Sequence, residues 1–244
     1  MQHNNAKIIH LISDLHLSEE QPNLFRLLEH YINNIAVRSE QLFVLGDLFE
    51  LWVGDDHLTP FNQSVIELFA GYSGELFFAH GNRDFLLGNH FAKACGGILI
   101  DEPYHFEWEN KKVSLMHGDS LCTDDVAYQQ LRNMVRNPQW QKEFLSQPVE
   151  ARLAFADSVR EQSKNSQKQK TAEIMDVNQS SVSRFVEENQ CDWLIHGHTH
   201  RPASHQIKYN DGKICERLVL SDWRDKGHYL ELRDNQLNNT YFQY

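Results

Sequence analysis

The chain contains 244 residues, of which 41% are hydrophobic and 11% aromatic, so it can bury a substantial core. This composition excludes a disordered chain, and the length favours one large domain over two small ones. The 34 acidic residues outnumber the 23 basic ones and give a formal charge of -11, which disfavours nucleic acid as a partner because its phosphates would be repelled.

The first third of the chain alternates predicted strands and helices. Short apolar runs rich in Ile, Leu, Val and Phe predict buried strands at residues 6–12, 41–45 and 75–79. Runs with apolar residues at helical spacing, each opened by a proline, predict helices at 22–37 and 60–69. This alternation indicates an α/β fold, with a parallel sheet that carries helices on its faces.

The rest of the chain adds strands around one helical stretch. Strands are predicted at residues 98–100, 104–108, 112–116, 191–195, 205–209, 214–220 and 228–232. Residues 124–163 have apolar residues at helical spacing, interrupted by Pro138 and Pro148, which predicts two or three inserted helices. Residues 132–170 carry eight basic and four acidic side chains, so this stretch is a basic island in an acidic protein.

The sequence favours a soluble, cytoplasmic protein. No run approaches the roughly 20 apolar residues of a spanning helix, and the first residues lead into an apolar run without a cleavable signal. The four cysteines are far apart and form no CxxC pair, so we expect buried thiols rather than a zinc site or a disulfide framework. They are Cys95, Cys122, Cys191 and Cys215.

One kind of polar cluster recurs at the ends of the predicted strands. The five clusters are Asp14-Leu15-His16, Gly46-Asp47, Gly81-Asn82-Arg83-Asp84, His117-Gly118-Asp119 and His196-Gly197-His198-Thr199-His200. Open α/β sheets gather their ligand sites at the carboxyl ends of the strands, so we expect these side chains to converge. Carboxylate and imidazole together suit divalent ions such as Mn, Fe or Zn, and a lone magnesium is disfavoured.

Each cluster alone has a plainer interpretation. A single Asp-x-His after a strand is usually a turn, and Gly, Asn and Asp dominate turns in general. The five clusters in this order are what favours a metal site. The other histidines are expected to be mostly surface or core residues: His3, His10, His30, His57, His80, His90, His105, His196, His205 and His228.

The ordered set resembles the calcineurin-like metallophosphoesterases, whose pattern is D-x-H, GD, GNH[DE], H and GHxH, and the match runs from Ile9 to beyond Thr199. The resemblance implies a β-sandwich flanked by helices. It implies one metal ion held by Asp14, His16, Asp47 and His200, and a second held by Asp47, Asn82, His117 and His198. These seven residues would be the catalytic set, with Asp47 bridging two ions that activate a water for in-line attack on phosphorus.

One position departs from the family pattern. Arg83 stands where most members have a histidine after the asparagine. An arginine cannot give a proton to a leaving group as that histidine does, but it can hold a phosphate by a two-pronged contact. We therefore expect a leaving group that needs little protonation, such as a phosphate within a diphosphate.

Further motifs narrow the resemblance to a branch of the family that cleaves the diphosphate of a nucleotide-activated, two-chain glycolipid in lipid A biosynthesis. They are Gly-Asp-Leu-Phe-Glu-Leu-Trp at 46–52, Ile-Met-Asp-Val-Asn at 174–178 and His-Gly-His-Thr-His-Arg-Pro at 196–202. This branch implies two Mn²⁺ ions, a monomer, and peripheral association with the cytoplasmic face of the inner membrane.

The same resemblance makes the inserted helices, at about residues 122–170 of a single 1–244 domain, a lid. The apolar residues expected to line an acyl cleft there, unless they only pack the insert onto the domain, are Val126, Leu131, Met134, Val135, Trp140, Phe144, Leu153, Phe155 and Val159. The basic excess is expected to meet anionic head groups near the membrane. The residues expected to contact the substrate head group are Asn82, Arg83, Asp125, Ser163, Gln167, Lys170 and His198, with Gln167 in place of the usual asparagine.

Two other functions stay open from the sequence. A phosphodiesterase or phosphatase for a soluble substrate, such as a cyclic nucleotide, would use the same metal ligands, but Arg83 and the long insert count against it. A non-catalytic scaffold with this fold would have no need of all seven ligands.

Overall fold

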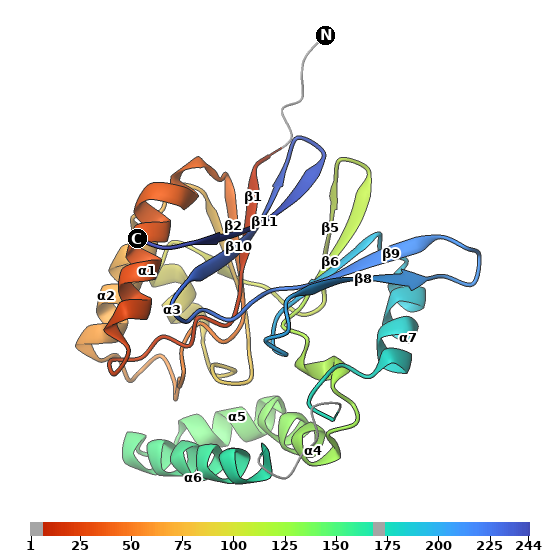
Figure 1. Cartoon of the computed structure of the whole chain (residues 1–244). Coiled ribbons are helices and arrows are strands. Elements are labelled where there is room, and N and C mark those ends of the chain that lie inside the picture. The colour runs from red at the N-terminus through yellow and green to blue at the C-terminus, as the bar shows by residue number, and fades with distance from the viewer. Residues whose placement is uncertain (1–6, 168–173) are drawn as a thin grey trace.

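Two β-sheets packed face to face form the body of the molecule (Figure 1). The computed structural model describes residues 7–167 and 174–244. The first sheet has the order β11-β10-β1-β2-β3-β4 and comprises β1 (Ile9–Ile12), β2 (Gln41–Leu45), β3 (Glu75–Ala79), β4 (Ile98–Leu99), β10 (Gly227–Arg233) and β11 (Gln236–Phe242). The second has the order β5-β6-β7-β9-β8 and comprises β5 (Tyr104–Trp108), β6 (Lys111–Leu115), β7 (Trp193–His196), β8 (Ala203–Lys208) and β9 (Ile214–Val219).

Parallel strands occupy the centre of both sheets, as the alternating sequence pattern predicts. β1 pairs in parallel with β2 and β2 with β3, while β6 pairs with β7 and β7 with β9. Parallel neighbours end at the same edge of a sheet, so the loops that follow them lie together. β2, β3 and β5 occupy the predicted residues 41–45, 75–79 and 104–108.

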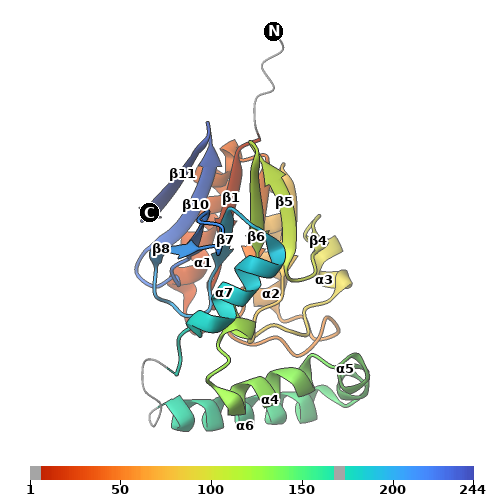
Figure 2. The ribbon, with the colours of Figure 1, turned by 90° about the vertical axis from the view of Figure 1, so that its right-hand side faces the viewer.

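Helices cover the outer face of each sheet (Figures 1 and 2). α1 (Pro22–His30), α2 (Pro60–Ala70) and α3 (Asn89–Ala94) lie on the first sheet, and α7 (Gln179–Asn189) lies on the second. Phe69 of α2 and Val182 of α7 are buried against their sheets, and Phe43 and Leu115 are buried between the sheets. The central strands are therefore covered on both faces, which explains their nearly continuous apolar sequences. The expected sandwich flanked by helices is confirmed.

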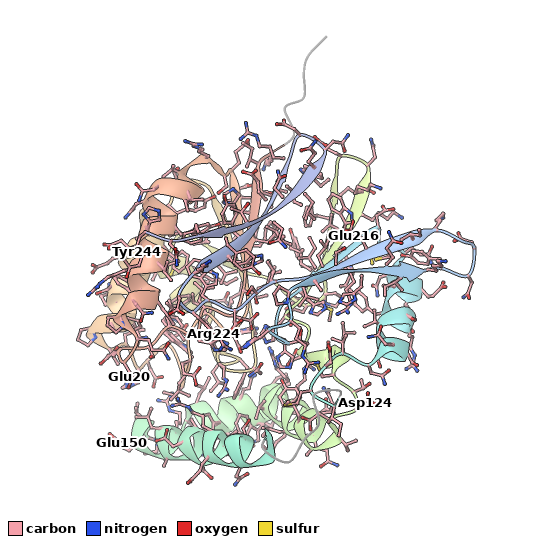
Figure 3. The ribbon with its side chains drawn as sticks, viewed as in Figure 1. Glu20, Asp124, Glu150, Glu216, Arg224 and Tyr244 are labelled. Carbon is pink, nitrogen blue, oxygen red and sulfur yellow. The ribbon has the colours of Figure 1, made fainter. Side chains whose placement is uncertain are left out.

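Three helices inserted between β6 and β7 lie across one end of this body (Figure 2). They are α4 (Val126–Val135), α5 (Pro138–Leu145) and α6 (Val149–Gln167), which follow a short 3-10 turn η3 (Asp119–Leu121). Pro138 is the first residue of α5, and α6 begins directly after Pro148, so each proline marks a helix start. In Figure 3, Asp124 marks where the chain passes from the body to α4. We call these three helices the insert.

Several elements differ from the predictions. The helix predicted at 22–37 is α-helical only to His30, and a π-helical turn η1 (Tyr31–Ile35) and a 3-10 turn η2 (Ala36–Arg38) complete it. Asn34 Nδ2 donates to the carbonyl of His30 at 3.0 Å, and such side-chain bonds compete with the regular helical ladder. The sequence did not predict α3, which has six residues, α7, or β11, a largely exposed edge strand.

Several polar or reactive side chains lie in the core, as expected. All four cysteines are buried. His10, His196 and His228 are buried as well and lie outside the set of predicted ligands. Within residues 7–167 and 174–244, no helix combines the length and the apolarity needed to cross a bilayer.

Candidate metal centre

Seven polar side chains from five strand ends meet at one edge of the two sheets, and we call this group the centre. Asp14 and His16 follow β1, Asp47 follows β2, Asn82 follows β3, His117 follows β6, and His198 and His200 follow β7. Because β1, β2 and β3 are parallel to one another, and β6 is parallel to β7, each sheet delivers its residues at one edge. The structure brings together every residue of the predicted ligand set.

The first half of the centre contains Asp14, His16 and His200. His16 Nε2 and His200 Nε2 are 3.2 Å apart, and Asp14 Oδ1 lies 3.3 Å from His200 Nε2 and 4.0 Å from His16 Nε2. Asp14 Oδ1 is buried and has no hydrogen-bond donor in acceptable geometry. Two ring nitrogens and a carboxylate oxygen thus face one another, which is the arrangement of ligands around a cation.

The second half contains Asn82, His117 and His198. Asn82 Oδ1 lies 3.0 Å from His117 Nε2 and 2.8 Å from His198 Nδ1, and the two nitrogens are 3.2 Å apart. Asp47 stands between the halves, with Oδ2 3.9 Å from His16 Nε2 and Oδ1 3.7 Å from His117 Nε2. Each of its oxygens therefore faces a different half, as a bridging ligand requires.

These spacings fit divalent cations. Metal–ligand bonds of about 2.1 Å place neighbouring ligand atoms roughly 3.0 Å apart in an octahedral site and roughly 3.4 Å apart in a tetrahedral one. Within each half, the closest pairs of ligand atoms are 2.8, 3.0, 3.2 and 3.3 Å apart, which is near that range. Imidazole, carboxylate and carboxamide donors together suit Mn, Fe or Zn.

The ligand loops adopt a backbone conformation that most residues avoid. Asp14, His16, Asp47, His198 and His200 have positive φ angles of 56°, 49°, 51°, 64° and 53°. A non-glycine residue held there costs roughly 1–3 kcal/mol, and such residues gather at functional sites. The packed sheets hold these loops so that five ligand side chains turn toward the centre.

Gly46 allows three of these loops to approach closely. Its φ angle is +84°, and a Cβ atom added to it would lie 2.6 Å from the Cα of Gly81 and 2.7 Å from His117 Nδ1. No side chain fits at such distances, so only glycine permits this turn directly after β2.

Polar groups behind the ligands fix their orientation. His117 Nδ1 lies 2.9 Å from the carbonyl of Leu45, so this nitrogen carries the proton and Nε2 is left to bind a cation. Glu50 Oε2 lies 3.2 Å from His16 Nδ1, so a carboxylate stands behind that ring as well.

Sequence reasoning assigned no role to Glu50, Asp84 or Asp222. Asp84 accepts a hydrogen bond from the backbone N–H of Gly81 at 2.7 Å, and Asp222 Oδ2 lies 3.5 Å from His200 Nδ1. Glu50 and Asp84 lie within the sequence motifs noted above, but the motifs alone assign no function to either side chain. Asp222 follows β9, so the criterion used for the ligands, a polar residue after an apolar strand, could also have identified it.

The buried charges of the centre interact strongly. Burial raises the pKa of Asp47. Burial would also raise the pKa of Asp14, but the imidazoles of His200 and His117 hold it below its usual value. Burial lowers the pKa of His117, yet Asp47 and Asp14 together raise it to about 9. Burial and the charge of His117 lower the pKa of His198 to about 3. Without a cation both ring nitrogens of His117 carry a proton, and binding of a metal ion must displace the proton on Nε2.

A cavity of 70 Å³, which we call the insert pocket, lies between the insert and the centre. Asn82 and Arg83 line it from the body. The residues of the insert that were expected to line an acyl cleft and that line this pocket are Leu131, Val135, Phe144, Phe155 and Val159. The pocket is thus a mostly apolar space that opens beside two residues of the predicted site.

Four other residues expected in the acyl cleft lie elsewhere. Val126 and Met134 are exposed on the outer side of α4. Trp140 packs on Phe144, with ring centroids 4.7 Å apart, and does not line the insert pocket. Leu153 lines a different cavity, on the side of the body near His57. Helical spacing identifies apolar residues, but it does not say which of them faces a given pocket.

Arg83 is held beside the centre. Its backbone N–H donates to Asp47 Oδ1 at 2.8 Å, and its Nη1 lies 3.7 Å from Glu50 Oε1. Its Nε is buried and has no hydrogen-bond partner in the part of the chain that the structure describes. The guanidinium therefore offers a donor in the insert pocket, next to Asn82.

Asp119 joins α4 to the centre. Its Oδ2 accepts hydrogen bonds from the hydroxyl of Tyr128 at 2.7 Å and from Arg132 Nε at 2.8 Å. The ring of Tyr128 stacks on His198, with centroids 5.8 Å apart. One residue of the insert thus contacts both a buried carboxylate and a predicted ligand.

Two basic side chains of α6 also turn toward the body. Arg152 is buried and pairs through both terminal nitrogens with Asp56. Arg160 Nη2 lies 3.1 Å from Glu50 Oε1. Together with Arg132, these arginines hold the insert against the body, so part of the basic excess contacts the protein itself. Lys142 is exposed, and the side chains of Lys164, Lys168 and Lys170 lie outside what the structure describes, so the expected contact with anionic head groups stays a prediction.

The remaining residues expected to contact substrate have weaker structural support. Asp125 caps α4 by accepting from the backbone N–H of Tyr128 at 3.1 Å, and Ser163 is half-buried in α6. Gln167 ends α6, but its side chain lies outside what the structure describes, and Lys170 lies outside the described residues altogether.

Known proteins resemble this chain over most of its length. Residues 8–202 match the family model of the calcineurin-like phosphoesterases. A protein of Chromohalobacter salexigens named UDP-2,3-diacylglucosamine hydrolase is 46% identical over 88% of this chain and 88% of its own. One of the same name from Tolumonas auensis is 40% identical over 93% and 94%. Among solved structures, vacuolar protein sorting 29 of Cryptosporidium parvum aligns over 99% of both chains, with 14% identity and a TM-score of 0.46. Because the family model spans most of its residues, this chain belongs to the calcineurin-like phosphoesterases.

Proposed function

We propose that this chain hydrolyses UDP-2,3-diacylglucosamine at the α-phosphorus, giving UMP and 2,3-diacylglucosamine 1-phosphate in lipid A biosynthesis. The observation that carries the proposal is an apolar pocket which opens directly beside the centre, at Asn82 and Arg83. A lipid with a phosphate at its head would place the phosphate at the centre and its chains under the insert. The relatives named UDP-2,3-diacylglucosamine hydrolase, similar over most of the chain, support this substrate.

Two Mn²⁺ ions are the proposed cofactor. Asp14, His16, Asp47 and His200 would hold one ion, and Asp47, Asn82, His117 and His198 the other. Such ions, when bound, supply Lewis acidity toward a phosphoryl group and make water nucleophilic near neutral pH. The chain itself sets their spacing through Asp47 and fixes the ligand rings through Glu50 and the carbonyl of Leu45.

Arg83 is proposed to hold the phosphate of the leaving group. Arg83 lines the insert pocket, and no described residue pairs with its buried Nε, so a phosphate oxygen can accept from it. Because an arginine stays charged and gives up no proton, it suits a leaving phosphate that needs none. Asn82, Asp125, Ser163, Gln167, Lys170 and His198 complete the proposed head-group contacts.

The insert is proposed to act as a lid on a single 1–244 domain. The insert pocket measures 70 Å³, which is less than the roughly 150 Å³ of a cavity that accepts one benzene, so two acyl chains require the insert to move outward. The proposal places the chain, as a monomer without a nucleic-acid partner, peripherally at the cytoplasmic face of the inner membrane, where such a lipid would be met.

Hydrolysis in ¹⁸O-labelled water tests the proposal. The protein would be stripped with a chelator, reloaded with Mn²⁺, and given UDP-2,3-diacylglucosamine, cyclic AMP or bis(p-nitrophenyl) phosphate. We expect rapid cleavage of the lipid only, with the label in UMP, because attack is at the α-phosphorus. Arg83→Ala should lower turnover of the lipid while metal content stays at the parent level, and Arg38→Ala, at an exposed position away from the centre, is the matched control.

Other outcomes would select the alternatives. Cleavage of the soluble esters alone would indicate a phosphodiesterase for soluble substrates. The absence of all turnover in a fully loaded protein would indicate a scaffold. Label in the lipid product would show that water attacks the other phosphorus of the diphosphate, which would contradict the role given to Arg83.

A further inference from the structure

A second pocket lies beside the loop that carries His198 and His200, and the described residues that line it include none of the insert. It has a volume of 290 Å³ and is formed by that loop, β8, β9 and Asp176. We call it the loop pocket. It shares no lining residue with the insert pocket, and the residues that matter here are Asp176, Thr199, Arg201, Pro202, Arg217 and Val219.

Arg217 gives the loop pocket an unpaired buried donor. Its side chain is 2% exposed, and its Nη1 lies 3.0 Å from His196 Nε2. His196 Nδ1 lies 2.9 Å from the carbonyl of Gly197, so Nδ1 carries the proton and Nε2 accepts from the arginine. Among the described residues, Arg217 Nε has no hydrogen-bond partner, and neither does the buried hydroxyl of Thr199. Buried polar groups are nearly always paired, so two unpaired ones in a single pocket wall indicate a missing polar ligand.

The position of the loop pocket relates it to the reaction. Thr199 stands between the predicted ligands His198 and His200. The insert pocket instead meets the centre at Asn82 and Arg83. A molecule with a phosphoryl group at the centre can therefore extend into the insert pocket at one end and into the loop pocket at the other.

We propose that the loop pocket binds the nucleoside of the nucleotide half of the substrate. This inference rests on the proposed function, which makes that nucleoside a uridine. A pyrimidine nucleoside presents carbonyl acceptors, a ring donor and ribose hydroxyls. Arg217 and Thr199 offer donors to the carbonyls and hydroxyls, and Asp176 offers an acceptor. Pro202 and Val219 provide apolar contact for the base.

Charge favours the loop pocket over the other large cavity next to the centre. That cavity, the acidic pocket, measures 630 Å³ and is lined by Glu19, Glu20, Glu50 and Arg160 among other residues. Three carboxylates against one guanidinium would repel a nucleotide anion. The loop pocket has the opposite balance, because Arg201 and Arg217 face the single carboxylate of Asp176, with Arg201 Nη1 2.7 Å from Asp176 Oδ2.

Binding of UMP to the Mn²⁺-loaded protein tests the proposal. We expect Arg217→Gln to raise the Kd of UMP, measured by calorimetry, about tenfold or more, because a charged hydrogen bond is lost. Asp176→Asn, at a partly exposed position that should fold normally, is expected to raise the same Kd. Both variants should raise KM for the lipid substrate more than they lower kcat, and inhibition by 2,3-diacylglucosamine 1-phosphate should stay at the parent level. Arg233→Gln, on the exposed β10–β11 hairpin, is the matched control.

The outcomes separate this inference from the proposed function. If the parent cleaves the lipid but both variants bind UMP as tightly as the parent does, the loop pocket is not the nucleoside site. If Glu20→Gln changes the affinity for UMP instead, the nucleoside lies in the acidic pocket and the inference is wrong. If the parent binds UMP through Arg217 and Asp176 but does not cleave the lipid, the loop pocket stands and the proposed function fails.

Discussion

Glu50 links the centre, Arg83 and the insert, so we expect Glu50→Gln to weaken metal binding and turnover together. Its Oε2 lies 3.2 Å from His16 Nδ1, and its Oε1 lies 3.1 Å from Arg160 Nη2 and 3.7 Å from Arg83 Nη1. Burial would raise the pKa of Glu50, but the hydrogen bond with His16 and the two arginines lower it to about 2. The side chain is therefore ionised at neutral pH, and the substitution removes a full charge.

The size of the effect follows from the position of Glu50 behind a histidine ligand. Removal of such a partner typically lowers metal affinity 10- to 100-fold, which is about 1.4 to 2.7 kcal/mol. The side chain of Glu50 is 23% exposed, so water screens part of its charge. We therefore expect the lower part of this range, about a tenfold loss of affinity for the ion nearest His16.

Titration of stripped protein with Mn²⁺ against a fluorescent chelator measures this loss. Glu20→Gln is the matched control, because Glu20 lies on the side of the body that faces the insert (Figure 3) and lines the same acidic pocket. Within the described residues, Glu20 makes no hydrogen bond or ion pair with a ligand of the centre. An affinity for Mn²⁺ in Glu50→Gln equal to that of Glu20→Gln would refute the role of Glu50.

Three further predictions concern the loops, the insert and the core. Gly46→Ala should lower metal content while far-ultraviolet circular dichroism stays near that of the parent, because the new Cβ would collide with neighbouring loops of the centre; full metal content would contradict this. Arg152→Met should lower the free energy of opening of α6 by about 1–3 kcal/mol, because the carbonyl of Val53 loses a buried donor at 2.6 Å. Amide hydrogen exchange in α6 should therefore be faster, and unchanged exchange would argue against that role. Burial lowers the pKa of His228 below its usual 6.5. As the pH falls below 6.5, the unfolded chain therefore binds more protons than the folded one, and the free energy of unfolding should decrease. Chemical unfolding between pH 7 and 5 should show a flatter dependence for His228→Gln, and parallel curves would exclude this histidine as a cause.

The apolar strands and the polar clusters at their ends could be predicted because both depend on local sequence. β2 and β3 are covered on both faces, so they appear as unbroken apolar runs such as Leu42–Phe43–Val44–Leu45. The position of a residue directly after such a run places it at the edge of the sheet, whichever partner strand it meets. This is why all seven predicted ligands lie at the centre.

Features that depend on distant partners could not be predicted. Arg152 and Asp56 are 96 residues apart in the chain, and the sequence does not show that the insert turns its arginines inward. β11 pairs only with β10 and is largely exposed, so it has no apolar pattern to detect. α7 did carry a local signal, because Asn178 caps it by accepting from the backbone N–H of Ser181 at 2.9 Å.

The place at which the chain leaves the body ties the insert to the cation itself. The chain leaves the body for the insert shortly after His117, and Tyr128 of α4 stacks on His198; the ring nitrogens of these two histidines are 3.2 Å apart. In the proposed lid movement, an outward swing of these helices would therefore disturb both ligands at once, and by reciprocity a bound ion would resist that swing with the same free energy. Removal of the ions by a chelator would then ease the outward movement of the insert and weaken its hold on a lipid, although the ions lie away from the atoms that the acyl chains would contact.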